Sequence, residues 1–187
     1  FYGSAGIGPR PKNSPVLQVK SGINYSLISG LNTGETETVQ IDFKLSEVTF
    51  MSGDIILLAS QYQYEMLRDN FRIFSDYLIP AGKYNFFRHS FQVTSAKRRK
   101  IWGLSKISIG SFYSGRRTDW LIQSGCKITV PVFAGLESDR RWVSLPEGDF
   151  ITQIYRASLN IHINPDISLY NYAQYENRTG TIGLQSR

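Results

Sequence analysis

Long stretches in which polar and apolar side chains alternate with a period of two are the feature that most limits how this chain can fold. From residue 151 to residue 163, every second position is mostly apolar and the positions between them are mostly polar. A strand with this pattern has one apolar face and one polar face, whereas a helix would have no continuous apolar stripe. The same alternation occurs at 17–27, 37–45 and 119–130. The sequence therefore predicts an all-β chain.

The length of the alternating stretches narrows the prediction. Turn signals divide the chain into about ten strands, at 16–27, 36–50, 55–66, 84–96, 101–112, 119–130, 133–143, 149–163, 168–175 and from 180 onward. Most of them are about 11 to 15 residues long. Strands of globular proteins usually have about 5–6 residues, whereas a tilted strand that crosses a membrane needs about 9–11. The lengths favour membrane-crossing strands.

The expected connections alternate between two kinds. Tight turns are predicted at 51–54, 97–100, 131–132 and 164–167, and generally longer connections at 28–35, 67–83, 113–118, 144–148 and 176–179. Short turns at one end and longer loops at the other are typical of outer-membrane barrels. The longest connection, 67–83, is rich in apolar residues. We expect it to fold over the mouth of the barrel or into it.

These patterns predict one domain over residues 1–187, an antiparallel up-and-down meander that forms part of a transmembrane β-barrel. Mean hydropathy is −0.24 and no apolar run approaches the ~20 residues of a membrane-spanning helix. Alternating barrel strands average to such a polar composition. Both ends of the chain are expected to be truncated, since it begins without Met and stops within an alternating stretch.

The polar face carries a strongly basic set of side chains. If the apolar face contacts lipid, Asp42 and seven basic residues point into the lumen, where water or neighbouring side chains can satisfy their charges. The basic residues are Lys20, Lys44, Arg88, Lys106, Lys127, Arg156 and His162. They could select an anionic or carbohydrate solute. Alternatively, they could pair with Asp42 or with carboxylates on strands outside this chain.

Aromatic residues gather near the predicted strand ends. They are Tyr25, Tyr62, Tyr64, Phe112, Tyr113, Trp120, Trp142, Tyr170, Tyr172 and Tyr175. Such residues form girdles at the two interfaces of a membrane barrel. A platform for stacking sugar rings is the alternative, and the position near strand ends favours the girdle.

No pattern in the sequence indicates catalysis. There is no nucleophile elbow, phosphate loop or dinucleotide fingerprint. His89 and His162 have no partner at metal-ligand spacing, and Cys126 is alone. The net charge is +6, but the basic run 97–100 suits a charged turn, and no nucleic-acid-binding motif accompanies it. We therefore expect no enzyme, no cofactor, no metal and no nucleic-acid partner.

Three segments carry a resemblance to a known family. They are Ile109-Gly110-Ser111-Phe112-Tyr113-Ser114-Gly115-Arg116-Arg117, Leu145-Pro146-Glu147-Gly148-Asp149-Phe150, and Asn164-Pro165-Asp166-Ile167-Ser168-Leu169 followed by Gln174-Tyr175-Glu176-Asn177. Their order and spacing resemble domain-of-unknown-function family 5916, from about Ile101 onward and more weakly upstream. The resemblance implies the C-terminal β-barrel-like domain of bacterial proteins that carry an N-terminal domain similar to family-9 carbohydrate-binding modules. It implies no catalytic residues, and the sugar-related role of the other domain does not transfer to these residues.

The leading hypothesis is a non-enzymatic segment of a β-barrel in the bacterial outer membrane. Its partner would be the lipid bilayer, and its role anchoring, or the passage or recognition of an anionic or carbohydrate-linked solute. One alternative is a soluble, secreted β-sheet module that binds carbohydrate. Another is a membrane-associated hydrolase whose site lies on the loops.

Overall fold

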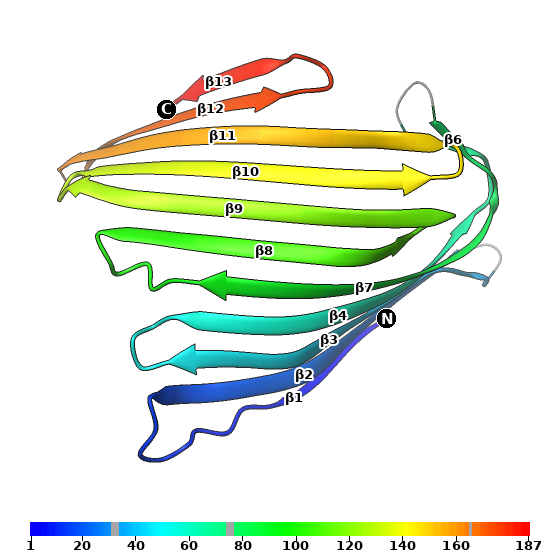
Figure 1. The fold of residues 1–187 in the computed structure, drawn as a ribbon, viewed down its shortest axis with the longest axis horizontal. Coiled ribbons are helices and arrows are strands. Elements are labelled where there is room, and N and C mark those ends of the chain that lie inside the picture. Colours follow the sequence, from blue (N-terminus) through cyan, green and yellow to red (C-terminus); the bar gives the residue numbers. More distant parts are fainter. Residues whose placement is uncertain (31–33, 74–76, 165) are drawn as a thin grey trace.

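The computed structural model describes residues 1–30, 34–73, 77–164 and 166–187, and within them the chain is all β (Figure 1). Eleven strands form one sheet in which each strand pairs antiparallel with the next. The strands of this sheet are β1 (Tyr2–Ile7), β2 (Val16–Ser29), β3 (Thr36–Phe50), β4 (Ile55–Leu67), β7 (Gly82–Thr94), β8 (Ile101–Phe112), β9 (Gly115–Thr129), β10 (Val132–Leu145), β11 (Gly148–Asn164), β12 (Ile167–Glu176) and β13 (Ile182–Ser186). Two more strands, β5 (Phe71–Ile73) and β6 (Tyr77–Ile79), form a separate hairpin between β4 and β7. The predicted antiparallel up-and-down meander is confirmed.

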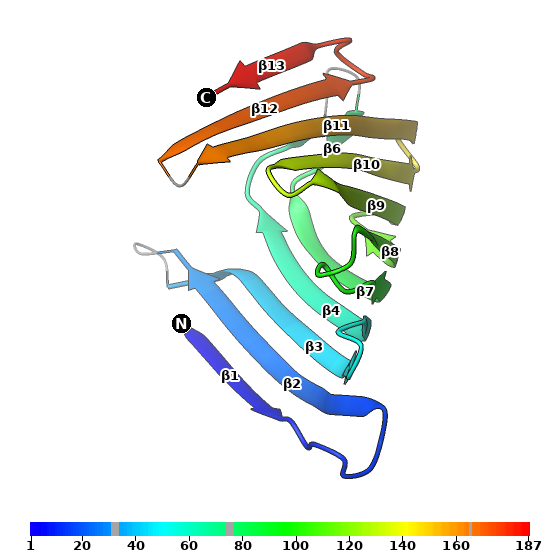
Figure 2. The same cartoon turned by 90° about the vertical axis from the view of Figure 1, so that its left-hand side faces the viewer.

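The sheet is curved, and its two edge strands do not pair with each other. Figure 2 shows the strands following an arc from β1 to β13, with the remaining side of the arc open. In the described residues β1 pairs with β2 alone and β13 with β12 alone. The structure is therefore a curved wall with two free edges. Within the same residues, no helix is long and apolar enough to cross a membrane.

Strand β1 is absent from the sequence prediction. Its residues include Gly3, Ala5 and Gly6, which have low β propensity and little alternation. Two glycines explain why it nevertheless pairs: Gly6 lies opposite Gly22 of β2. A Cβ on Gly22 would lie only 2.9 Å from the carbonyl oxygen of Ala5, so the two backbones approach too closely for a side chain.

The strands are staggered along the sheet. One row of paired residues can be followed across the sheet. It runs from Asn24 in the interior of β2 through Arg88 of β7 to Phe150 near the beginning of β11. A line of hydrogen-bonded partners therefore drifts along the strands as it crosses the sheet. A stagger of this kind accompanies strands that are tilted within a curved sheet.

The predicted difference between turns and loops is wrong in two places. Strands β8 and β9 are joined by residues 113–114 alone, and β10 and β11 by 146–147 alone, because the strands extend into the expected loops. Conversely, residues 8–15 make a longer connection among the tight turns. The predicted turn at 164–167 includes Pro165, and the connection at 28–35 includes 31–33, which lie outside the described residues.

The described parts of the apolar segment 67–83 fold back over one end of the polar face of the sheet. Its Ile79 is fully buried and packs with Val143, Leu145 and Phe150 from β10 and β11. The ring of Tyr77 stacks on that of Phe150 at a centroid distance of 5.1 Å. We call this end of the sheet the cap end. Residues 74–76 of the segment lie outside the described residues.

The two faces of the sheet differ in chemistry. Alternation places large apolar side chains on the convex face, where many remain exposed: Leu136 by 65%, Ile109 by 52% and Phe91 by 44%. The concave face carries most of the charged and amide side chains. Away from the cap end, neither face is covered by another layer of the described residues. We call them the apolar face and the polar face.

Candidate functional site on the polar face

The polar face is built by matching the alternation of neighbouring strands. Asp42 of β3 lies opposite Gln61 of β4, which lies opposite Arg88 of β7. One row further, Ser108 of β8 lies opposite Asp119 of β9, which lies opposite Arg141 of β10. Because side chains of paired residues point to the same side, charged groups from distant parts of the sequence become neighbours.

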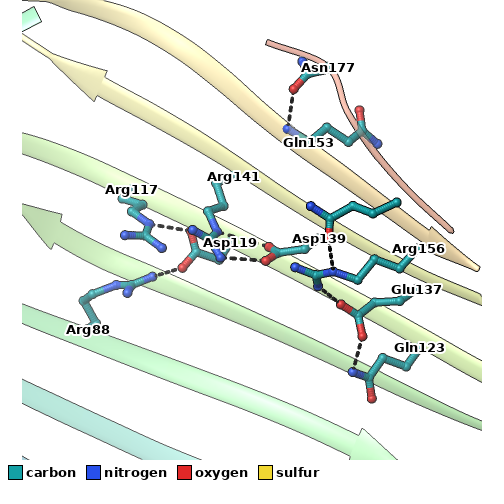
Figure 3. Close-up of polar contacts among 11 residues, drawn as sticks. Arg88, Arg117, Asp119, Gln123, Glu137, Asp139, Arg141, Gln153, Arg156 and Asn177 are labelled. Carbon is teal, nitrogen blue, oxygen red and sulfur yellow. Dashed lines mark hydrogen bonds and ion pairs between the residues drawn. The ribbon is translucent and has the colours of Figure 1, made fainter. Parts of the chain in front are cut away.

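One group of contacts centres on Asp119 (Figure 3). Arg117 of the same strand donates from Nε to its Oδ1 at 2.6 Å, and Arg88 of β7 donates to its Oδ2. Beside it on β10, Arg141 donates from Nη2 to Oδ2 of Asp139 at 2.7 Å. Asp119 and Asp139 have side chains that are only 17% and 13% exposed. Three arginines and two carboxylates thus form a compact, largely neutralised cluster.

A second group lies further from the cap end. Arg156 of β11 pairs with Glu137 of β10 and also donates from Nε to Oε1 of Gln174 at 3.1 Å. The other oxygen of Glu137 accepts from Nε2 of Gln123 at 2.7 Å. These contacts cross β9, β10, β11 and β12 in a single line (Figure 3). The line ties four strands together through side chains as well as through their backbones.

The N-terminal strands carry a third group. Glu47 of β3 accepts from Nζ of Lys44 at 2.7 Å and lies 3.5 Å from Nζ of Lys20. Asp42 accepts from the amides of Gln61 at 2.7 Å and Gln40 at 2.9 Å. Asp42 therefore hydrogen-bonds with amide groups, whereas Lys20 and Lys44 form their ion pairs with Glu47.

A hollow of about 220 Å³ lies between these groups. Its charged and amide lining comes from Asn24, Asp42, Lys44, Gln61, Arg88 and Lys106. Lys106 forms no ion pair within the described part of the chain. The hollow therefore offers one uncompensated ammonium group beside amides and hydroxyls, which suits an anion or a hydroxyl-rich solute.

All seven predicted basic residues lie on the polar face, but the structure does not bring them into one cluster. Lys20, Lys44, Arg88 and Arg156 are in the ion pairs described above. Lys127 donates to the carbonyl oxygen of Arg98 at 3.4 Å, at the end opposite the cap. His162 hydrogen-bonds through Nδ1 with Ser168 and lies edge-on to the rings of Phe133 and Tyr170.

The carboxylates that pair with this set are the functional residues that the sequence reasoning missed. They are Glu47, Asp119 and Glu137, on strands of this chain, so the partners expected at Asp42 or on strands outside it are not the ones observed here. A signal existed: Glu137 and Asp139 are in phase with Arg141 on one strand. The sequence pattern places Asp119 at the first position of a strand, whereas β9 begins at Gly115 and Asp119 lies within it.

The ten predicted interfacial aromatics divide between the faces. Tyr25, Tyr62, Tyr64, Trp120, Trp142 and Tyr175 lie on the apolar face. The other four do not. Phe112 and Tyr113 pack against the buried cluster at the cap end. Tyr170 contacts His162, and Tyr172 donates to Gln174, both on the polar face. Alternation turns Tyr170 and Tyr172 to the polar face, and the packing at the cap end covers Phe112 and Tyr113, so these four do not share the face of the other six.

Two groups outside the strands have shifted pKa values. Burial, reinforced by nearby Glu65, raises the pKa of Tyr113 to about 12. At the opposite end, Asp54 accepts from Ser52 at 2.6 Å, from Arg99 at 2.7 Å and from the amide of Ala96 at 2.9 Å. These contacts, with that from Ser52 the strongest, lower the pKa of Asp54 to about 2. Asp54 thereby links the β3–β4 turn to the β7–β8 connection.

The fold and its polar face define a class: a large, curved, up-and-down antiparallel sheet with an ion-paired concave face. Within the described residues, no group of three or more histidine, cysteine or acidic side chains is arranged to hold a metal ion. No protein-family model matches the sequence, and the searches of curated proteins and of solved structures find no match.

Proposed function

We propose that this chain is a non-enzymatic part of a β-barrel that spans the outer membrane of a bacterium. The observation that carries the proposal is the distribution of side chains across the sheet. Apolar side chains project from the uncovered convex face, while Arg88, Asp119 and Arg141 meet on the concave face. In water this arrangement would leave a large apolar surface solvated. In a bilayer it places the apolar face in lipid and the charges in a lumen.

The dimensions of the strands support the same conclusion. Nine strands of the main sheet run from β2 to β12. The eight strands up to β11 have 12 to 17 residues, and β12 has 10. About 9–11 residues suffice for a tilted strand to cross a bilayer. The stagger of the residue pairs accounts for a tilt of this kind. Closure would require pairing of the free edges of β1 and β13 with further strands.

The polar face suggests the role of the interior. On the polar face, carboxylates hold the arginines in place and neutralise their charges. The hollow beside Lys106 is where a solute would meet a positive charge that has no carboxylate partner in the described part of the chain. We infer anchoring, together with recognition or passage of an anionic or carbohydrate-linked solute. The resemblance to domain-of-unknown-function family 5916 is consistent with a barrel-like domain in a carbohydrate-associated bacterial protein.

Detergent-dependent folding tests the proposal. The protein is refolded from urea with and without micelles, and its heat-modifiable gel mobility and β-type circular dichroism are measured. Folding only in micelles or lipid, with a mobility shift on boiling, is the expected result. A folded, monomeric and water-soluble β-protein without detergent would overturn the proposal, and sugar binding through the exposed tyrosines and tryptophans would be the next assay.

A further inference from the structure

Arg140 is placed differently from the other arginines in the middle of the sheet. It lies on β10 between Asp139 and Arg141, so alternation turns it to the apolar face while its two neighbours point to the polar face. Arg88, Arg117, Arg141 and Arg156 each pair with a carboxylate. Arg140 forms no ion pair with any described residue, and its Nε is buried without a hydrogen-bond partner.

The surroundings of Arg140 are aromatic. Its guanidinium carbon lies 4.8 Å from the ring centre of Trp142, two residues along the same strand. Its cross-strand partners are Trp120 on β9 and Gln153 on β11. An arginine is costly at the centre of a bilayer but costs little near its interfaces. Tryptophans beside it are typical of the level at which lipid headgroups lie.

An apolar groove begins beside Arg140 and runs away from the cap end. One row below Arg140, Ser138 lies between Ile122 and Tyr155, and the next row contains Leu136 and Ala157. The hollow over these residues has a volume of about 480 Å³. It continues into a second hollow of about 510 Å³ that shares Ala157 and Ala173 and reaches Leu184. Small side chains form the floor, and larger ones stand along the sides.

We propose that Arg140 and this groove bind one anionic, phosphate-bearing membrane lipid. The guanidinium group, which has no carboxylate partner among the described residues, would hold the phosphate through its terminal nitrogens at the level of Trp120 and Trp142. An acyl chain would lie in the groove over Ser138, Ala157 and Ala173. This inference rests on the proposed membrane insertion and adds a specific lipid site to it. Charge complementarity with Arg140 selects an anionic headgroup. The groove runs from Arg140 away from the cap end and suits the acyl chain of the lipid.

Tryptophan quenching by brominated lipids tests the site. The full-length protein is reconstituted in phosphatidylcholine vesicles that contain either chain-brominated phosphatidylglycerol or chain-brominated phosphatidylcholine at the same mole fraction. Trp120 and Trp142 report lipid beside Arg140, while the contribution of Trp102 is common to all samples. We expect relative binding to favour phosphatidylglycerol by about fivefold, the effect of one arginine near a membrane surface.

Variants separate a site from general attraction. Arg140→Gln is expected to bring the ratio close to one, and Arg140→Lys to leave it between the two values. The control Lys83→Gln removes a charge from an exposed position of β7 at the cap end and should keep the wild-type ratio. Equal quenching by both lipids in the wild type, or an unchanged ratio in both Arg140 variants, would overturn the lipid site while leaving the barrel intact. Absence of quenching by either lipid would instead overturn membrane insertion.

Discussion

On the polar face, Arg88 and Arg117 converge on Asp119, whereas on the apolar face Arg140 lies against Trp142 without a carboxylate. The two arrangements are separated by the thickness of one sheet. On the concave side, charges from β7, β9 and β10 neutralise one another. On the convex side, ion pairs are replaced by exposed apolar and aromatic side chains. The comparison shows that the same type of side chain is held by ion pairs on one face of the sheet and lies against an aromatic ring on the other.

Ordinary globular packing does not explain this difference. A soluble sheet buries its apolar face against a second layer and exposes its polar face to water. Here the only fully covered cluster lies at the cap end, around Ile79, among the residues that the structure describes. None of the described residues forms a second layer over the apolar face. Lipid would supply that layer, and the energetics of each face can be tested separately.

The largest expected effect comes from placing a charge on the apolar face. Ile107, in the middle of β8, is 38% exposed there, and its neighbour Ser108 lies on the polar face beside the hollow. Ile107→Arg should lower the free energy of unfolding in bilayers by about 2–3 kcal/mol. This is the lower part of the range for arginine at the midplane of a barrel, because Ile107 lies in one row of paired residues with Trp120 and Arg140. Ser108→Arg should cost much less, because the same charge enters a polar environment. Urea titrations of vesicle-inserted protein, followed by tryptophan fluorescence, measure both.

These two variants form a matched pair, since each adds the same side chain to adjacent positions of one strand. Equal destabilisation would mean that the two faces do not differ in polarity of environment, and the membrane proposal would then lose its main support. A larger cost for Ser108→Arg than for Ile107→Arg would indicate that the apolar face is in contact with water.

Removal of a shared carboxylate should have the next largest effect. Asp119→Ala leaves both Arg88 and Arg117 without the acceptor that holds them. We expect a loss of about 1–3 kcal/mol, the usual cost of leaving partly buried charged donors unsatisfied. The same urea titration measures it. In a double-mutant cycle, Arg88→Gln should recover part of the loss; strictly additive losses would show that this pair does not stabilise the sheet.

The alternation of side chains made most of the sheet predictable. From β2 to β13, each strand of the main sheet has a counterpart in the sequence prediction, and the common face of Lys44, Arg88 and Arg156 followed from period two alone. The strand formed by residues 2–7 was missed because its small residues carry no such pattern. Its pairing depends on the close approach of Gly6 and Gly22, which is a property of two strands together.

Partners of the charged residues were less predictable for a physical reason. Alternation determines the face of a residue, whereas an ion pair also requires the register between strands. Arg88 and Asp119 meet across β8, and no local pattern indicates that they come within reach. The aromatics at strand ends show the same limit: Phe112 and Tyr113 are buried because the segment 67–83 folds onto them, which depends on the tertiary structure.

At the cap end, the segment 67–83 covers the polar face and forms a small protein interior. The ionisation of Tyr113 reports how well this interior excludes water. Folding raises the pKa of Tyr113 from 10 to about 12 and so favours its neutral form. Its contribution to the free energy of unfolding is therefore complete below pH 10 and is lost as the pH rises toward 12. Ultraviolet titration of tyrosinate should show this residue ionising last, in a step that Tyr113→Phe removes. The variant should lose about 1 kcal/mol of stability at neutral pH through its contact with Glu65. Ionisation of Tyr113 together with the exposed tyrosines would contradict a closed cap.

The smallest effect is expected at Asp54, which lies outside both faces. It joins two neighbouring connections through Ser52, Arg99 and the amide of Ala96. Since folding lowers its pKa from 3.8 to about 2, its stabilising contribution is complete above pH 4 and disappears as the pH falls toward 2. Asp54→Asn should therefore reduce stability slightly at neutral pH and flatten the decline between pH 4 and 2, as measured by urea midpoints in micelles.

The response to salt compares Asp54 with Asp119. Because the contacts of Asp54 are exposed to solvent and screened, they should weaken with added salt. The paired arginines at Asp119, which are shielded on the polar face, should respond much less. A stronger salt response at Asp119 than at Asp54 would show that the polar face is open to bulk solvent. It would also show that the curved sheet does not shield the charges of that face.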